Sequence, residues 1–224
     1  MQKTDLKNRQ CVILFLKAPK AGRVKTRLEK KLGKDIPLHL YRYFVTDTLH
    51  MLRKQRIILC YHPPGAEAEI RNWLGEEYIR MPQEGNDLGE RMHNAFIRAF
   101  AAGYREVLLT GSDIPDLPEE IIREAFAALR EKDAVIGPAC DGGYYLIGFR
   151  KAGFSPDVFR NIPWSTATVF EDTLKIFSRQ QSRIHILPGW RDIDEYEDLM
   201  DFRQRAGKAH SSETRRYLES VFPA

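Results

Sequence analysis

Basic side chains crowd residues 17–34, where eight lysines and arginines stand against a single acid, Glu29. They surround Gly22, which lets the backbone come close to a ligand. Lysine and arginine heads together with backbone N–H groups suit a di- or triphosphate, so this segment predicts a phosphate-binding loop. A solvated basic surface or a nucleic-acid patch is the alternative. Lys25-Thr26 lacks the preceding glycine of a Walker A loop, and no G-x-G-x-x-G dinucleotide fingerprint is present.

A second segment, Thr110-Gly111-Ser112-Asp113-Ile114-Pro115-Asp116, places acids directly after an apolar run. A carboxylate at the end of a strand can hold a divalent cation against phosphate oxygens. This gives Asp113 a predicted metal role, with an Asx-turn as the alternative. For Asp116 we predict the N-cap of the next helix.

Acids gather again near the C-terminus, where six lie within residues 191–201. Ile193 is expected to point into the core, which leaves Asp192 and Asp194 on the opposite side of an extended segment. Asp194 also begins a capping box with Glu197. The two roles are compatible, because a cap uses one carboxylate oxygen and leaves the other free.

Residues 137–146 combine Asp141 with paired glycines and paired tyrosines. Asp-Gly is a strong turn signal, so a plain hairpin is one interpretation. The same residues would also form the wall of an acceptor pocket, in which Asp141 contacts or deprotonates an acceptor hydroxyl. Trp164 completes that wall or simply packs. The candidate acceptor residues are Asp141, Gly142, Gly143, Tyr144, Tyr145, Trp164, Ser165 and Thr166.

The elements that must position these residues alternate along the chain. Short apolar runs predict strands at 11–16, 57–61, 78–81, 106–110, 133–137, 144–149 and 183–187. Helical periodicity or a capping box predicts helices at 37–53 and 87–102 and helices that begin near Asp116, Thr168, Asp194 and Ser212. Strands with little alternation, separated by helices, indicate an α/β fold, with a mostly parallel sheet covered on both faces.

Length and composition exclude several classes of protein. At roughly 150 residues per domain, 224 residues favour one domain, and we expect 1–224 to be that domain, with a core at about 10–205 and a helical tail at 206–224. Cys11–Leu16, the longest apolar run near the N-terminus, has six residues and cannot span a bilayer. With no secretory signal pattern and three widely spaced cysteines, the chain is expected to be cytoplasmic and its thiols reduced.

Five motifs in this order resemble the DUF2064 family, bacterial predicted glycosyltransferases of the nucleotide-diphospho-sugar transferase superfamily. They are the basic glycine loop, G-S-D-I-P, D-G-G-Y-Y-L-I-G, I-P-W-S-T and D-I-D-x-x-E-D-L. The resemblance runs from about residue 11 to residue 202. It implies a single-domain, three-layer α/β/α sandwich of the GT-A type.

The same resemblance implies roles for individual residues. The opening loop is similar in position to the triphosphate-binding loop of sugar-nucleotide pyrophosphorylases, which points to Arg23, Lys25 and Arg27. It implies a metal at Asp113 with Asp192 or Asp194, and a nucleotide-bordering loop at 83–91, for which a plain N-cap at Asp87 with Leu88 in the core is the alternative. The implied nucleotide-binding residues are Lys17, Ala18, Pro19, Gly22, Arg23, Lys25, Thr26, Arg27, Gly85, Asp87, Leu88, Gly89, Arg91, Gly111 and Ser112.

The predicted activity is group transfer from a nucleotide-activated donor to a small-molecule acceptor, with Mg²⁺ or Mn²⁺ as the cofactor. Asp113, Asp141 and Lys25 are the predicted catalytic residues. Glycosyl and nucleotidyl transfer both stay open, since the spacing Asp113-x-x-Asp116 departs from the Asp-x-Asp of such glycosyltransferases. A non-catalytic nucleotide or nucleic-acid binder is the hypothesis from another class. Nucleic acid is disfavoured as a partner, because residues 17–34 contain no aromatic side chain to stack a base; the oligomeric state, a homodimer included, stays open.

Overall fold

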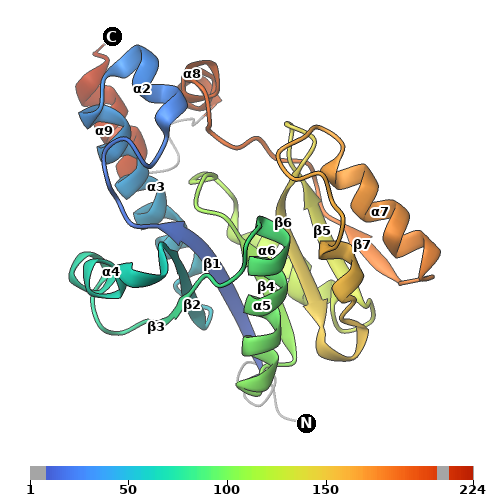
Figure 1. Ribbon diagram of the computed structural model, residues 1–224. Helices are drawn as coiled ribbons and strands as arrows, with labels where there is room; N and C mark the ends of the chain where they lie inside the picture. The colour runs from blue at the N-terminus through green and yellow to red at the C-terminus, as the bar shows by residue number, and fades with distance from the viewer. Residues whose placement is uncertain (1–8, 206–211, 224) are drawn as a thin grey trace.

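A seven-stranded sheet forms the centre of the computed structural model, which describes residues 9–205 and 212–223 (Figure 1). The strand order is β3-β2-β1-β4-β6-β5-β7, and only β6 runs antiparallel to its neighbours. The predicted mostly parallel sheet is therefore confirmed. The strands are β1 (Gln10–Lys17), β2 (Ile57–His62), β3 (Ile79–Pro82), β4 (Glu106–Thr110), β5 (Ala134–Pro138), β6 (Tyr144–Arg150) and β7 (Ile184–Ile186).

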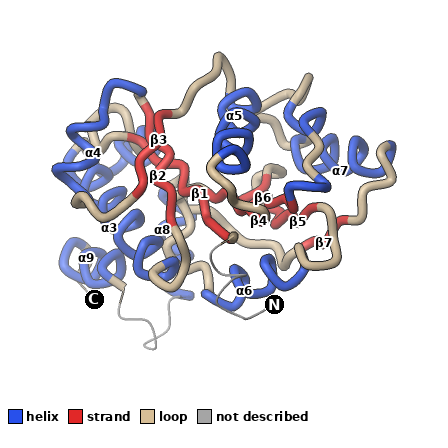
Figure 2. Tube along the Cα trace, turned by 90° about the horizontal axis from the view of Figure 1, so that it is seen from below, coloured by secondary structure: helices blue, strands red, loops and turns tan. Residues whose placement is uncertain are grey.

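Helices cover both faces of this sheet, as the view along its edge shows (Figure 2). Side chains of α3, α4 and α6 pack on one face, and those of α5 and α7 pack on the other. This is the predicted three-layer sandwich. The helices are α2 (Thr26–Leu32), α3 (Asp35–Leu52), α4 (Glu67–Leu74), α5 (Leu88–Ala101), α6 (Glu119–Ala128), α7 (Val169–Arg179), α8 (Tyr196–Arg205) and α9 (Glu213–Val221), with 3₁₀ turns at Pro64–Ala66, Lys151–Gly153 and Pro156–Phe159.

The first strand shows why its apolar run does not alternate with polar residues. Val12 and Leu14 join the cluster on one face of the sheet, and Cys11 and Ile13 join the cluster on the other, each with no exposed surface. A strand buried on both faces needs apolar side chains at every position. Its end is then held rigidly, so the loop that follows it has a fixed origin.

A third apolar cluster packs α2, α3, α8 and α9 against one another beyond one end of the sheet (Figure 1). Asp47 of α3 accepts hydrogen bonds from the N–H groups of Glu213 (2.9 Å) and Thr214 (3.0 Å), which fixes the start of α9. Ser212 also caps α9, so the helix predicted to follow it is confirmed. This cluster positions α2, which begins directly after Lys25.

Two predicted helix starts are wrong. Helix α6 begins at Glu119 rather than Asp116, because the Asp116 carboxylate accepts a hydrogen bond from the Trp190 indole (3.0 Å) instead of capping a helix. Helix α8 begins at Tyr196 rather than Asp194. In each case the carboxylate that was predicted to cap the helix accepts a hydrogen bond from a distant side chain, Trp190 for Asp116 and Lys25 for Asp194.

The helices α2 and α4 were not predicted, and residues 206–211 of the predicted tail lie outside the described residues. Cys11, Cys60 and Cys140 are all free thiols. Among the described residues, no helix is both long and apolar enough to cross a membrane.

Candidate functional site

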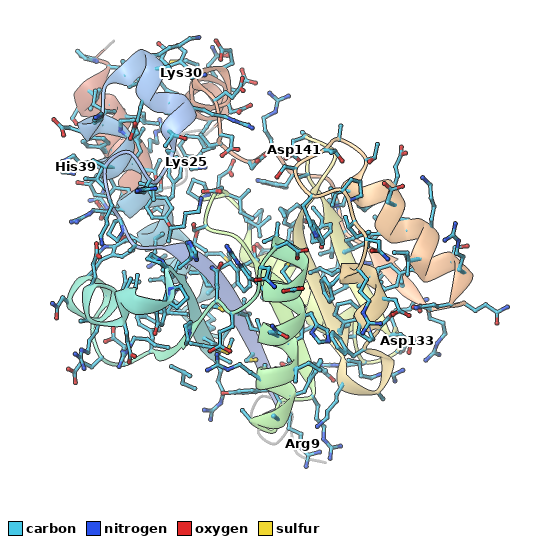
Figure 3. The ribbon with its side chains drawn as sticks, viewed as in Figure 1. Arg9, Lys25, Lys30, His39, Asp133 and Asp141 are labelled. Carbon is cyan, nitrogen blue, oxygen red and sulfur yellow. The ribbon has the colours of Figure 1, made fainter. Side chains whose placement is uncertain are left out.

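Two adjoining cavities open at the end of the sheet where β1 and β4 finish. The first, which we call the basic cavity, has a volume of about 550 Å³, and the second, the acidic cavity, has about 250 Å³. Figure 3 shows Lys25 and Asp141 at this end of the molecule, with Arg9 and Asp133 at the other. Residues that line both cavities are Leu88, Gly111, Asp113, Tyr144 and Tyr145.

The basic cavity brings together most of the predicted phosphate ligands. Its predicted lining residues are Lys17, Arg23, Lys25, Thr26, Arg27, Leu88, Arg91, Gly111, Ser112, Asp113 and Asp194. Leu88 was expected in the core under the plain-cap interpretation; it is 43 % exposed, so that expectation is wrong. Asp87 does cap α5, accepting a hydrogen bond from the Glu90 N–H (2.8 Å).

The acidic cavity collects the predicted acceptor residues. Its lining includes Asp113, Asp141, Gly143, Tyr144, Tyr145, Trp164, Ser165, Thr166 and Asp192. Strands β5 and β6 form the predicted hairpin, whose turn carries Asp141. The Asp141 carboxylate accepts a hydrogen bond from the Gly143 N–H (2.8 Å), which leaves its second oxygen available. The predicted hairpin therefore forms part of the wall of the acidic cavity.

Several predicted site residues support the cavities without lining them. Ala18 and Pro19 are buried in the packing, and the Gly22 N–H donates to Glu29 (2.7 Å). A Cβ at Gly89 would lie 2.3 Å from the Phe159 carbonyl oxygen, too close for any side chain. Gly85 and Gly142 also stand outside both linings.

Lys25 is the most constrained residue of the site. It has a left-handed backbone (φ 50°, ψ 41°) at the start of α2, and its side chain is only 3 % exposed. Its Nζ donates to Asp113 Oδ1 (2.7 Å), Asp194 Oδ1 (2.9 Å) and the Ile193 carbonyl (2.6 Å). An ammonium group has three protons, so all three are used. The predicted role of Lys25 as a direct phosphate ligand does not fit this arrangement; the residue holds two acids together instead.

Burial and ion pairing compete at this cluster. Burial alone would lower the pKa of Lys25, but the carboxylates of Asp113 and Asp194 raise it above its ordinary value. Burial would raise the pKa of Asp194, but Lys25 and Arg27 hold it below its ordinary value. Lys25 and Asp194 are therefore both charged at neutral pH.

The prediction that Ile193 points into the core is confirmed, and this residue separates two acids. Ile193 is fully buried and its N–H donates to the Asp113 carbonyl (2.9 Å). Asp194 then faces the basic cavity and Asp192 the acidic one. Burial, together with the carboxylates of Asp141 and Asp194, raises the pKa of Asp192 to about 6.

A prediction follows from this raised pKa. A buried acid whose folded pKa exceeds its unfolded pKa destabilises the protein at pH values above the folded one, and this penalty disappears as the pH falls toward 4. Asp192→Asn should therefore raise the free energy of unfolding at pH 8 by about 1–2 kcal/mol, after a discount for solvent screening. The gain should fall to about a third of that value near pH 4.5, because it vanishes only below the unfolded pKa of about 3.9. Denaturant unfolding at the two pH values checks this, and an equal gain at both would contradict it.

Sequence reasoning missed two polar residues that line the basic cavity. The Tyr41 hydroxyl accepts from the Lys17 N–H (2.6 Å) and donates to the Lys17 carbonyl (3.1 Å). The Gln83 amide donates to the carbonyls of Cys60 (2.9 Å) and Leu16 (3.3 Å). Both brace the end of β1 from elements distant in sequence. Tyr41 is indistinguishable from its apolar neighbours in the helical pattern, whereas Gln83 heads the predicted 83–91 loop.

The predicted metal ligands provide suitable chemistry for Mg²⁺ or Mn²⁺, because carboxylate oxygens are the ligands these cations prefer. Asp113 and Asp194 are brought together, and both are partly exposed, at 44 % and 38 %. Within residues 9–205 and 212–223 there is, however, no cluster of three acids, histidines or cysteines arranged for a metal. A cation here would share Asp113 and Asp194 with Lys25 and would need further oxygens from a ligand.

The fold is the nucleotide-diphospho-sugar transferase fold, and the candidate site lies at the ends of its central strands. The chain belongs to DUF2064, a family described as uncharacterized proteins conserved in bacteria, whose model matches residues 45–166. It is 42 % identical to a protein of Desulfovibrio desulfuricans G20 named provisionally as a nucleotide-diphospho-sugar transferase. That match covers 95 % of this chain and 94 % of the other, with a TM-score of 0.90.

More distant structures share the fold alone. One is the 4-diphosphocytidyl-2C-methyl-D-erythritol synthase of Anaerococcus prevotii, at 14 % identity, with 94 % and 99 % of the chains covered and a TM-score of 0.57. Another is a CMP:2-keto-3-deoxy-manno-octonic acid synthetase in complex with CTP, at 9 % identity, 89 % and 99 % coverage and a TM-score of 0.55. None of the curated proteins matches this sequence.

Proposed function

We propose that this protein is a nucleotide-diphospho-sugar transferase that binds the donor's phosphates in the basic cavity and its acceptor in the acidic cavity. The observation that carries the proposal is the separation of charge between the two. The basic cavity is lined by five cations, Lys17, Arg23, Lys25, Arg27 and Arg91, and by two acids; the acidic cavity is lined by three carboxylates and by no described lysine, arginine or histidine.

Two of the cations are uncommitted and exposed. The side chains of Lys17 and Arg23 make no hydrogen bond or ion pair with another part of the described chain. Arg91 donates from Nε to the Gly85 carbonyl (3.1 Å), and its terminal nitrogens make no hydrogen bond or ion pair with the described residues. These guanidinium and ammonium groups can hold phosphate oxygens by charge-assisted hydrogen bonds.

In the proposed reaction the bond between the sugar carbon and the donor phosphate breaks, and its electron pair leaves on the phosphate oxygen. The acceptor hydroxyl oxygen forms the new bond to the sugar carbon and gives its proton to a carboxylate; we propose Asp141 for this role because it lines the acidic cavity. Lys17, Arg23 and Arg27 stabilise the charge on the departing diphosphate. When bound at Asp113 with Asp194 or Asp192, Mg²⁺ or Mn²⁺ would neutralise part of that same charge.

A nucleotidyltransferase is the second candidate, and two observations favour it. Five cations against Asp113 and Asp194 leave a surplus that suits a triphosphate. Asp116, the other acid of the Asp113-x-x-Asp116 pair, is turned to Trp190 and does not line either cavity. Product analysis separates the candidates, because glycosyl transfer releases a nucleoside diphosphate or monophosphate and nucleotidyl transfer releases pyrophosphate.

A thermal-shift panel of nucleotide sugars and nucleoside triphosphates, each with and without Mn²⁺, tests the shared proposal. Stabilisation that requires nucleotide supports it, and stabilisation that also requires Mn²⁺ supports the metal at Asp113. A protein that responds to none of these ligands but binds nucleic acid with a steep salt dependence would be the non-catalytic binder instead.

Arg23→Ala should weaken nucleotide binding by about tenfold, since one charge-assisted hydrogen bond to phosphate contributes about 1.4 kcal/mol. Lys20→Ala is the matched control, because Lys20 pairs with Glu69 (3.1 Å) and lies outside the cavity. Isothermal titration calorimetry with the nucleotide that gives the largest thermal shift measures both. Equal losses in the two variants would point to a diffuse charge effect rather than a site.

A further inference from the structure

We propose that the acceptor carries no phosphate and is a polyhydroxylated, sugar-like molecule held in the acidic cavity. This inference rests on the proposed function, which assigns the acceptor to that cavity. It concerns the chemical class of the acceptor. The predicted nucleotidyl transfer uses a phosphorylated acceptor, so an acceptor without phosphate would favour glycosyl transfer.

The charge of the acidic cavity argues against a phosphorylated acceptor. Asp113, Asp141 and Asp192 line it, and no lysine, arginine or histidine from the described chain does. Like charges at contact distance repel, most strongly where burial lowers the local dielectric. A phosphate group there would meet the carboxylates of Asp141 and Asp192, which have no ion-pair partner among the described residues, while the charge of Asp113 is already balanced by Lys25.

The ion-paired cluster at the boundary keeps the cations away from this cavity. Lys25 is fixed by Asp113, Asp194 and the Ile193 carbonyl, and Arg27 reaches Asp194 (3.4 Å). Neither lines the acidic cavity. Donor phosphates and acceptor are therefore directed to opposite sides of Asp113. Repulsion of a phosphorylated acceptor then contributes to specificity as much as attraction of the correct acceptor does.

The uncharged part of the wall suits a sugar ring. The rings of Tyr144 and Trp164 meet edge to face with centroids 6.4 Å apart, and the Trp164 indole sits over Gly89, where a Cβ would come within 2.8 Å of it. Rigid aromatic faces offer apolar surface to C–H groups, while carboxylates and the hydroxyls of Ser165 and Thr166 offer partners for several O–H groups. An apolar wall with a few polar groups that fix orientation is typical of a small-molecule site.

Paired probes test the inference on the intact protein saturated with its nucleoside diphosphate. Saturation-transfer NMR would compare glucose with glucose 6-phosphate, myo-inositol with inositol 1-phosphate, and glycerol with glycerol 3-phosphate. We expect contact with one or more neutral members and at least tenfold weaker binding of each phosphorylated partner. Phosphorylated members that bind as well or better, or neutral members that all fail to bind, would overturn the inference.

A charge reversal sharpens the test. Asp141→Lys should admit the phosphorylated partner of the bound probe and weaken the neutral one, whereas Asp157→Lys, an exposed change outside both cavities, should change neither. If Asp141→Lys leaves the preference as in the wild type, the inference fails. A wild-type protein that binds no nucleotide would be a different failure, because it would contradict the proposed function. The calorimetric titration that compares wild type with Arg23→Ala measures nucleotide binding separately.

Discussion

Lys25→Met is expected to lower the free energy of unfolding by about 2–3 kcal/mol. Methionine keeps most of the apolar stem but leaves Asp113, Asp194 and the Ile193 carbonyl without the ammonium that joins them. Removing one partner of a buried ion pair costs about 3–5 kcal/mol; the lower figure applies because both carboxylates are more than a third exposed. Denaturant unfolding at pH 7 measures the loss.

The control for this variant is Lys20→Met, which removes an exposed ion pair with Glu69 and should change stability by less than about 0.5 kcal/mol. The pH dependence supplies a second check. Because the pKa of Asp194 is lowered in the folded protein, its contribution is present above about pH 4 and is lost as the pH falls further. The difference between wild type and Lys25→Met should therefore shrink at pH 3, and a difference independent of pH would contradict the ion-pair account.

Asp113→Asn is expected to reduce the rate of transfer by about 10²–10³, the usual cost of removing one positioned charge from a reacting centre. The residue lies on the boundary of the two cavities, where donor and acceptor would meet. If it also anchors the cation, the Mn²⁺-dependent part of the thermal shift should disappear in the same variant. Single-turnover kinetics with the identified donor measures the rate.

Asp116→Asn is the matched control for this experiment. It lies three residues away on the same loop, and its amide oxygen can still accept the hydrogen bond from Trp190. Activity and Mn²⁺ response should stay within a factor of about two of wild type. If Asp116→Asn loses as much activity as Asp113→Asn, the loop acts as an acidic unit and the assignment of Asp113 alone is wrong.

Patterns that depend on neighbouring residues were the most predictable from sequence. The unbroken apolar run of β1 and the helical repeat of α5 gave the correct elements, because burial on two faces or on one leaves a local pattern. The loops after β1 and β4 were correctly predicted to lie together, since parallel strands bring their carboxyl ends to one edge. Both now line the basic cavity.

Partnerships between distant residues were not predictable. Asp116 and Asp194 were predicted to cap helices because a cap depends on neighbouring residues in the sequence. Their carboxylates instead accept hydrogen bonds from Trp190 and Lys25. Lys25 was predicted to bind phosphate and to act in catalysis, but its burial against Asp194, 169 positions away in the sequence, was not predicted. No spacing rule encodes a contact of that separation.

The sequence alone determined the class of fold, the sheet edge that carries the site and the charged residue types that gather there, since each follows from local periodicity or from the geometry of parallel strands. Only the tertiary structure decided how those charges are divided. It pairs Lys25 with Asp113 and Asp194 and, among the residues that the structure describes, leaves Lys17 and Arg23 without an ion-pair partner in one cavity and Asp141 and Asp192 without one in the other. The physical reason is that a charge acts through its distance and burial, and both are set by packing between segments that are far apart in the chain.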